Sequence, residues 1–284
     1  MQRTKLLNSI IVVLFTVFII SCSGSRQWPE PPLFTIPEND SLWIGPEDID
    51  EAMQMIAGHY AHFDVVAYED VTTKTPMKTF VISYGYTDFF IEEGKLFQVD
   101  TFCHAEQKIN QKFVKSLFKD ESVQAIQPRI QEVELQYEKG QWQIYRPESP
   151  TLLGITGDPS LPLSRDPKDP RLTDPDNDGN PGATVELKMG GLIKGELYIT
   201  RREIYTNHLV LHSNGNLYGY IEDRSEQFVI DASMKILRQQ SNPVQNPDRG
   251  MNPLILIRVS DEIDSCEELM EKRDLLFPDE PEFF

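Results

Sequence analysis

The sequence predicts a mainly β protein, an antiparallel β-barrel or β-sandwich of about ten strands with a short N-terminal helix and a C-terminal helix. Two observations lead to this prediction. Most of the chain after residue 62 alternates apolar and polar residues in runs rich in Val, Ile, Phe and Tyr, as half-buried strands do. Short gaps with glycine, among them Glu93-Gly94, Lys139-Gly140 and Asn214-Gly215, separate the runs and are typical of hairpin turns.

Residues 1–21 have the pattern of an export signal. Arg3 and Lys5 precede a mostly apolar run, Leu6 to Ile20, which is too short to cross a hydrocarbon core of about 30 Å as a helix. The run ends in Ile-Ile-Ser-Cys, which resembles the lipobox of bacterial lipoproteins. That resemblance implies lipid modification of Cys22, which becomes the first residue of the mature chain. An ordinary secretory signal and a membrane anchor are the alternatives.

The resemblance to lipoproteins also predicts a location. Ser23 follows the cysteine, and a residue other than Asp at this position implies sorting to the outer membrane. Several acyl chains, palmitate among them, would anchor the protein stably, because one chain alone binds a membrane only marginally. Residues 22–45 contain four prolines and predict an extended tether between the membrane and the body.

Local patterns assign the remaining elements in order. Pro46 and the two acidic residues after it predict a helix that ends near Gly58. Residues 108–118 break the alternation and predict another short helix, and Ser260 or Asp261 predicts the N-cap of the last helix. Residues 46–284 are expected to form a single β-rich domain. Within it, residues 147–182 are rich in Pro and Asp and are expected to cross over the domain as a long ordered segment. The alternative is that this crossing links two domains.

The cysteines predict one disulfide bond. Cys22 is assigned to lipid, which leaves Cys103 and Cys266 as an even pair in a chain exported to an oxidising compartment. A bridge between them would join the last helix to the strand that contains Cys103. Two buried free thiols are the alternative.

The segment from Asp174 to Asn180 predicts a metal site. Asp174, Asp176, Asp178 and Gly179 fill positions 1, 3, 5 and 6 of a D-x-D-x-D-G pattern, in which alternate carboxylates turn towards one Ca²⁺ ion. The carbonyl of Asn180 can add a ligand at position 7, and a bound dication relieves the repulsion between the three carboxylates. A solvated acidic turn without an ion is the alternative.

This segment departs from an EF-hand, because Val185 stands at position 12 and an alternating strand follows in place of a helix. Glu186, one residue later, is the candidate to complete the ligand set. The loop therefore resembles the calcium loops of thrombospondin type 3 repeats. The layout of the C-terminal half is similar to that of uncharacterised bacterial secreted or lipid-anchored proteins. Both resemblances imply a structural Ca²⁺ and no particular activity.

The formal net charge of −18 argues against nucleic acid as a partner. The sequence contains no nucleophile elbow, Walker loop or zincin motif, so no catalytic residue is assigned. We therefore expect a non-catalytic binding or envelope-structural protein, held at the outer membrane through Cys22. One alternative is a carrier of a small apolar ligand, because Gly58-His59-Tyr60 resembles the Gly-x-Trp motif of lipocalins. A second alternative is a periplasmic hydrolase that uses a carboxylate pair.

Overall fold

The computed structural model describes residues 25–45, 47–72, 76–191, 193–260 and 263–284. The expected export signal and Cys22 lie outside these residues, so lipidation stays a prediction. Within the same ranges, no helix combines the length and the apolar character that a membrane span needs.

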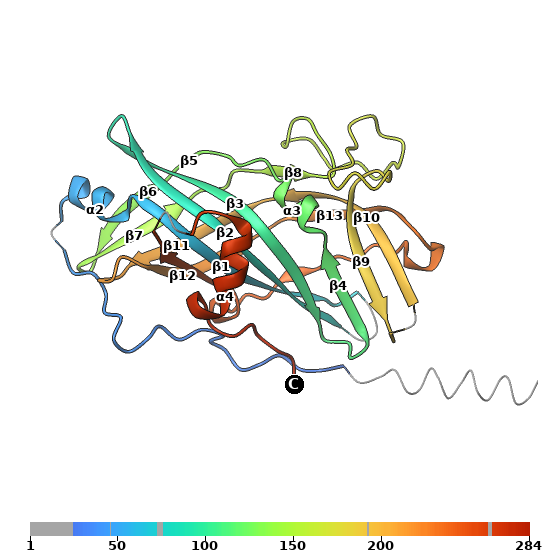
Figure 1. Ribbon diagram of the computed structural model, residues 1–284, viewed down its shortest axis with the longest axis horizontal. Coiled ribbons are helices and arrows are strands. Elements are labelled where there is room, and N and C mark those ends of the chain that lie inside the picture. Colours follow the sequence, from blue (N-terminus) through green and yellow to red (C-terminus); the bar gives the residue numbers. More distant parts are fainter. Residues whose placement is uncertain (1–24, 46, 73–75, 192, 261–262) are drawn as a thin grey trace, which may run out of the picture.

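The described chain forms one antiparallel sheet of 15 strands, which curls into a half-barrel (Figure 1). The mainly β, antiparallel class is confirmed, and the strands outnumber the ten expected. Twelve strands follow the order β13-β10-β9-β4-β3-β2-β1-β15-β12-β11-β7-β6, and β5, β8 and β14 pair with β3, β10 and β1. The strands are β1 (Gly58–Asp70), β2 (Met77–Glu92), β3 (Lys95–Ile109), β4 (Val114–Phe118), β5 (Gln131–Glu132), β6 (Glu134–Glu138), β7 (Gln141–Arg146), β8 (Thr151–Leu153), β9 (Ala183–Met189), β10 (Ile193–Glu203), β11 (Tyr205–Leu211), β12 (Leu217–Asp223), β13 (Glu226–Ala232), β14 (Val244–Gln245) and β15 (Pro253–Arg258).

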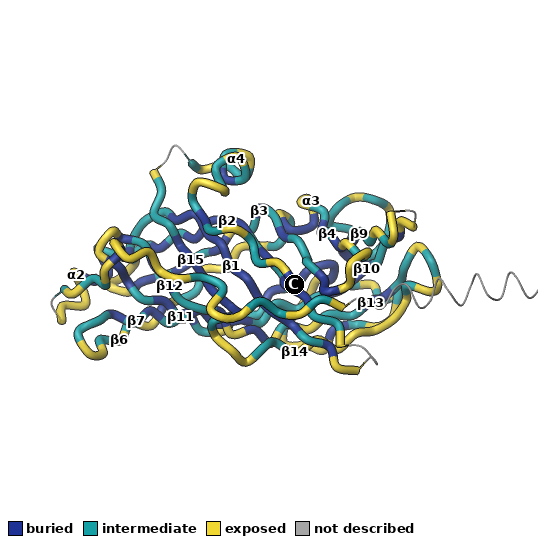
Figure 2. The backbone as a smooth tube through the Cα atoms, turned by 90° about the horizontal axis from the view of Figure 1, so that it is seen from below, coloured by how far each residue is buried: buried dark blue, intermediate teal, exposed yellow. Residues whose placement is uncertain are grey.

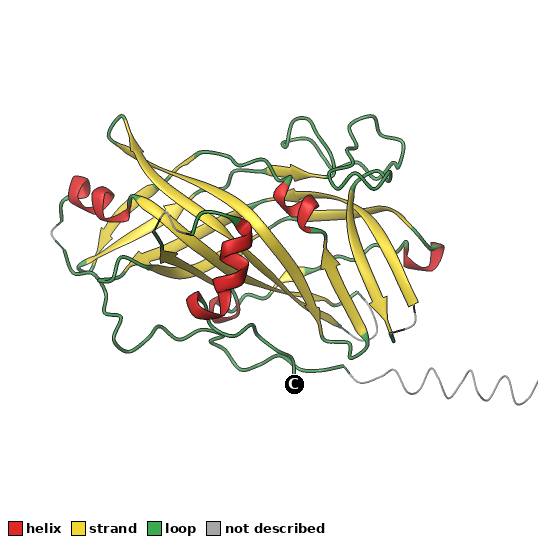
Figure 3. Ribbon diagram, viewed as in Figure 1, coloured by secondary structure: helices red, strands yellow, loops and turns green. Residues whose placement is uncertain are grey.

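The helices are few and short (Figure 3). Helix α2 (Ile49–Ile56) begins after Asp48, whose carboxylate accepts hydrogen bonds from two backbone amides of the first turn. Helix α4 (Cys266–Leu276) begins after Ser265, whose hydroxyl accepts a hydrogen bond from the amide of Glu268. The expected N-cap, Ser260 or Asp261, is therefore wrong, because Ser265 and Glu268 form the capping pair nearer to the helix. Both expected helices are therefore present. The others are α3 (Asp120–Gln124) and the 3₁₀ turns η1 (Lys235–Leu237) and η2 (Arg249–Met251).

The prediction of a helix at residues 108–118 is wrong. Strand β4 occupies the end of this segment and pairs with β3 and β9. Ser116 and Phe118 are buried while Lys115 is exposed, so the strand has the period of two that its pairing requires. Pairing with two neighbouring strands decides this conformation, and residues 108–118 alone do not show those neighbours.

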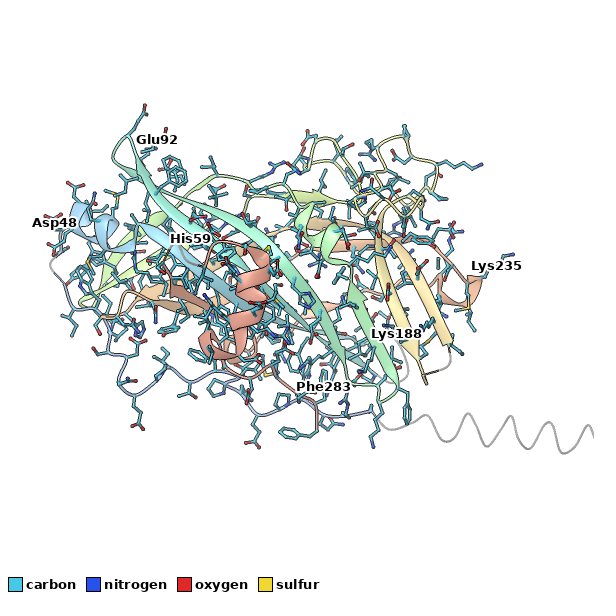
Figure 4. The ribbon with its side chains drawn as sticks, viewed as in Figure 1. Asp48, His59, Glu92, Lys188, Lys235 and Phe283 are labelled. Carbon is cyan, nitrogen blue, oxygen red and sulfur yellow. A yellow bond between two sulfur atoms is a disulfide. The ribbon has the colours of Figure 1, made fainter. Side chains whose placement is uncertain are left out.

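The predicted hairpin turns are confirmed. Glu93 and Gly94 both have positive φ angles, 49° and 75°, as a two-residue turn between β2 and β3 requires. Lys139 and Gly140 repeat this geometry between β6 and β7, with φ angles of 54° and 85°. Glu92, labelled in Figure 4, marks the projecting tip of the β2–β3 hairpin.

Strand β1 is buried on both of its faces, as the dark blue centre of Figure 2 shows. One set of alternate residues, which includes Tyr60, Val66 and Tyr68, packs inside the curl. The other set packs against α4 and the two terminal segments, and it comprises Ala61, Phe63, Val65 and Ala67. The sheet therefore has an inner core, and an outer core beneath the helix that crosses β1 and β2 in Figure 1.

Residues 25–45 differ from the expected tether, because they pack on the body. Gln27 exchanges two backbone hydrogen bonds with Phe284, and the amide of Leu33 donates to the carbonyl of Gly250. Trp28 packs against Phe80 of β2, with ring centroids 4.8 Å apart. Phe283, labelled in Figure 4, stacks on the same Phe80 at 4.7 Å. The segment is extended, as its prolines suggest, but its aromatic residues cover apolar surface of the sheet.

The predicted disulfide is confirmed. Cys103 of β3 and Cys266 of α4 are bonded, with their Cα atoms 5.2 Å apart, although the two residues are 163 positions apart in the sequence. The bond holds the start of α4 against the outer face of the sheet. Cys103 is itself buried in the outer core.

We predict that replacing both cysteines, Cys103→Ala with Cys266→Ala, lowers the free energy of unfolding by about 2–5 kcal/mol, because the open chain gains conformational freedom when unfolded. Urea unfolding monitored by circular dichroism measures the loss. A reductant should destabilise the unaltered protein by a similar amount and leave the double variant unaffected. Equal stability of the two proteins would contradict a stabilising role for the bond.

Candidate functional site

The aspartate loop lies at the end of the 147–182 crossing, directly before β9. The amide of Thr173 donates to the carbonyl of Gly154 at 3.1 Å, and the amide of Gly182 donates back to the carbonyl of Thr173 at 2.6 Å. Gly182 has a φ angle of 93°, and a Cβ atom there would lie 2.7 Å from the carbonyl oxygen of Ile199 in β10. Only glycine suits this position, so the loop is held closely against the sheet.

The loop brings its three aspartates together. Asp174, Asp176 and Asp178 each offer a carboxylate oxygen, and these atoms all lie within 4.8 Å of one another. Asp174 accepts hydrogen bonds from the backbone amides of Asp178 at 3.1 Å and Gly179 at 2.9 Å. Asn177 and Gly179 have positive φ angles, 54° and 86°, which make the tight turn. The sequence therefore predicted both the cluster and the turn that forms it.

Lys119, which precedes α3, reaches into this cluster. Its Nζ atom lies 2.8 Å from Oδ2 of Asp176 and 2.9 Å from Oδ2 of Asp178. The side chain of Asp176 has no exposed surface, and its Oδ1 atom has no hydrogen-bond partner among the described residues. A buried carboxylate oxygen without a partner is costly, so this atom is free to bind a cation.

The local charges fit a divalent cation. Burial alone would raise the pKa of Asp178, but hydrogen bonds from Lys119, Thr184 and the amide of Asn180 lower it to about 2. Burial would lower the pKa of Lys119, but the two neighbouring aspartates raise it well above the ordinary value. One ammonium beside three carboxylates leaves two negative charges, which a dication would balance. Carboxylate oxygens are the ligands that Ca²⁺ prefers.

Asn180 and Glu186, the two other residues expected to bind the ion, differ in position: Asn180 lies in the aspartate loop and Glu186 lies in β9. Asn180 lies in the loop, and its backbone amide donates to Oδ1 of Asp178 at 2.9 Å. Glu186 lies in β9 opposite Glu196 of β10, and its nearest cationic partner is Lys188, at 3.8 Å. The group of three carboxylates does not include Glu186. Coordination by the carbonyl of Asn180 stays a prediction.

A second site lies inside the half-barrel, where the sequence did not predict one. A cavity of about 70 Å³ lies among β1, β2, β3, β10, β11 and β12, and residues of β4, α3 and β8 also contribute to its lining. Most of its lining is apolar, but seven of the lining side chains are ionisable: His62, Asp64, Tyr68, Arg201, Glu203, Tyr205 and Asp223. Buried ionisable groups that converge on a cavity indicate a functional site.

A chain of hydrogen bonds runs from the cavity across the sheet. Oδ2 of Asp64 lies 2.9 Å from Nε2 of His62, whose Nδ1 lies 2.8 Å from Oγ1 of Thr87. Thr87 donates its hydroxyl proton to Asp100 at 2.7 Å, so Nδ1 of His62 must donate to Thr87. Nε2 of His62 and the carboxyl group of Asp64 therefore share one proton.

Because the sheet curls, Asp100 of β3 contacts residues of β7 and β11, two strands that are distant from β3 in the strand order of the sheet. Tyr205 of β11 donates its hydroxyl to Asp100 at 3.1 Å, and Nε of Arg146 in β7 lies 3.5 Å from the same carboxylate. Four strands separate β3 from β11 along the sheet. The guanidinium of Arg146 thus gives the buried Asp100 an oppositely charged partner, and this contact joins the two flanks of the half-barrel.

A second polar group lines the cavity, and it connects β10 and β12 with β1. Arg201 contacts Glu203 through two hydrogen bonds, of 2.5 Å and 3.2 Å. Tyr68 donates its hydroxyl to Asp223 at 2.5 Å, and Ser225 donates to the other oxygen of Asp223 at 2.7 Å. Burial raises the pKa of Asp223, although the charge of Arg201 acts in the opposite direction.

One signal in the sequence could have indicated the cavity. Around residue 64, β1 carries apolar side chains at every odd position from Ala61 to Ala67, which predicts one buried face. The even positions place His62 and Asp64 between Tyr60, Val66 and Tyr68, so the second face is also largely apolar. Charged residues on a second buried face indicate an internal polar site. Arg201, Glu203 and Asp223 carry no comparable signal.

Comparison of the chain with protein-family models, with curated protein sequences and with solved structures found no match in any of the three.

We predict that Lys119→Met makes the protein more dependent on calcium. Without Lys119 the buried Asp176 loses its cation, so the variant should melt at a lower temperature in EDTA. Calcium should then raise the melting temperature by more than in the unaltered protein, because the ion no longer competes with an ammonium group. Differential scanning calorimetry in EDTA and in calcium measures both effects.

Lys115→Met is the matched control. Lys115 is exposed on β4, and its replacement removes the same charge as the replacement of Lys119. The Lys119 prediction is contradicted if the two variants melt alike under both conditions.

Proposed function

We propose that the protein is a lipid-anchored component of a bacterial cell envelope, held at the outer membrane through Cys22, in which a structural Ca²⁺ ion stabilises a non-catalytic binding scaffold. The observation that carries the calcium assignment is the buried Oδ1 atom of Asp176, which lacks a partner among the described residues and belongs to a group of three carboxylates. Asp174, Asp176 and Asp178 would hold the ion, with the carbonyl of Asn180 as a further ligand.

Calcium at this place would stabilise the rim of the half-barrel. The loop leads directly into β9, and Thr184 of β9 donates its hydroxyl to Asp178 at 2.7 Å. Lys119 connects the same carboxylates to α3, whose Val123 packs in the core cluster with Val185 and Ile199. An ion bound by the three aspartates would therefore fix the loop that leads into β9, while Lys119 ties the same loop to the segment before α3.

The hydrogen bonds of His62, the histidine that lines the cavity, favour a binding function over a catalytic one. Nδ1 of His62 donates to Thr87 and Thr87 donates to Asp100, so His62 does not take the hydroxyl proton of Thr87 as the base of a nucleophile pair would. The hydrolase alternative needs an activated nucleophile or a base that faces a substrate. The lipocalin-like alternative needs a large apolar lumen, whereas this cavity measures about 70 Å³ and contains charged groups.

We predict that calcium raises the melting temperature of the unaltered protein and has no such effect on Asp176→Asn, because a neutral amide is a poor ligand for Ca²⁺ in this position. At saturating calcium the stabilisation should be about 2–4 kcal/mol. Asp166→Asn is the control, since Asp166 lies in the same crossing and outside the carboxylate group. Equal melting temperatures of the unaltered protein in calcium and in EDTA would remove the proposed ion.

We predict that cells that express the protein incorporate a radioactive fatty acid into it, and that Cys22→Ala abolishes this labelling because the thiol is the acylated atom. The double variant of Cys103 and Cys266 is the control, and it should remain labelled. Continued labelling of the Cys22 variant would exclude the proposed anchor.

A further inference from the structure

The cavity inside the half-barrel is lined by more negative than positive groups. Asp64, Glu203 and Asp223 line it, and Arg201 is the one guanidinium among the described residues that do so. Arg201 interacts with two of these carboxylates. It donates a hydrogen bond to Glu203, and its positive charge also lowers the pKa of Asp223. The lining is therefore negative whether the ring of His62 is charged or neutral.

Burial makes this excess of negative charge costly. The side chain of Asp64 is only 5 % exposed, and among the described residues its one hydrogen-bond partner is His62, with which it shares a proton. Burial raises the pKa of Asp64, and the nearby carboxylates of Glu203 and Asp100 raise it further, although His62 acts in the opposite direction. A cation placed among these groups would remove part of the cost.

The arrangement of the carboxylates does not suit a metal ion. In the described residues, the aspartate loop is the only place where three such ligand atoms lie within 4.8 Å of one another. Asp64 on β1, Glu203 on β10 and Asp223 on β12 come from three strands, and the three carboxylates are not gathered within that distance. Acceptors that are spread apart suit an ammonium group, whose N–H bonds point in different directions.

The remaining lining suits a short apolar chain. Val66, Val81, Phe102 and Ile221 contribute to it, and the aromatic ring of Tyr205 lies beside them. Aromatic faces attract organic cations, and the effect grows when water is excluded. A volume of about 70 Å³ has room for a few heavy atoms rather than for a lipid or a sugar chain.

We propose that this cavity is a binding site for a small organic cation, a primary ammonium group on a short apolar chain. Asp64 and Asp223 accept hydrogen bonds from the ammonium group, and Arg201 holds Glu203 in place beside it. This site is separate from the calcium loop and adds a ligand class to the proposed binding scaffold.

The test is isothermal titration calorimetry of the full mature chain, saturated with calcium, against n-propylammonium. Propan-1-ol and propionate are the matched probes, because they have similar size with neutral and negative head groups. We expect n-propylammonium to bind and the other two to bind at least about tenfold more weakly, as hydrogen bonds to charged groups are worth about 1.5–3 kcal/mol.

Two variants test the position of the site. Asp64→Asn and Asp223→Asn should each weaken n-propylammonium binding by about tenfold or more, because each removes a charged acceptor. Asparagine has nearly the shape of a protonated aspartic acid, and the two positions lie on different strands, so each variant provides an independent test. Asp231→Asn on β13 is the control, since Asp231 does not line the cavity and should bind as the unaltered protein does.

The result that supports the proposal is binding of n-propylammonium that both cavity variants weaken and the control does not. Absence of n-propylammonium binding overturns it. Preferential binding of propionate or propan-1-ol overturns the assigned ligand class. Binding that neither cavity variant changes overturns the assigned position, while the calcium experiments above remain unaffected by any of these outcomes.

Discussion

Strand β1 carries large side chains on both faces, and the need to bury both of them determines the rest of the architecture. A flat sheet with one helix layer would leave one of these faces in water, at a cost of about 25 cal/mol for each Å² of apolar surface. The sheet curls so that its own distant strands cover the inner face. Helix α4, the C-terminal residues and residues 25–45 cover the outer face, and the Cys103–Cys266 bond holds α4 there.

Curling the sheet encloses polar groups, and the structure pairs most of them. Asp100 meets Arg146 and Tyr205 across the half-barrel, and Glu203 meets Arg201. The two acidic regions differ in geometry. The loop gathers its carboxylates within 4.8 Å of one another, which suits an ion, whereas the carboxylates of the cavity come from three strands and are not gathered within that distance. This difference in spacing is why we assign them different ligands.

The sequence predicted the features that depend on neighbouring residues. The Glu93-Gly94 turn, the aspartate loop and the C-terminal helix α4 follow from local backbone preferences, and all three are present, although α4 is capped by Ser265 rather than by Ser260 or Asp261. The pairing of Cys103 with Cys266 could also be predicted, because only two cysteines remain after Cys22. Residues 108–118 could not be predicted correctly, since the strand at their end is stabilised by β9, which lies about 70 positions further along.

The candidate site was predictable only in part. Asp174, Asp176 and Asp178 are encoded within five residues, so the sequence alone shows that their carboxylates lie close together. Lys119 completes their charge balance from 57 positions before Asp176, and nothing in its own surroundings shows this.

The sequence by itself determined the β class, the turns, the disulfide partners and the acidic loop, because each depends on local backbone preference or on the small number of cysteines. The tertiary structure alone decided that residues 25–45 cover the sheet, that Lys119 reaches the loop, and that Asp64 and Asp223 meet at one cavity. The physical reason is that these contacts join segments far apart in the chain, and only the curl of the sheet brings them within the few ångströms over which hydrogen bonds and apolar contacts act.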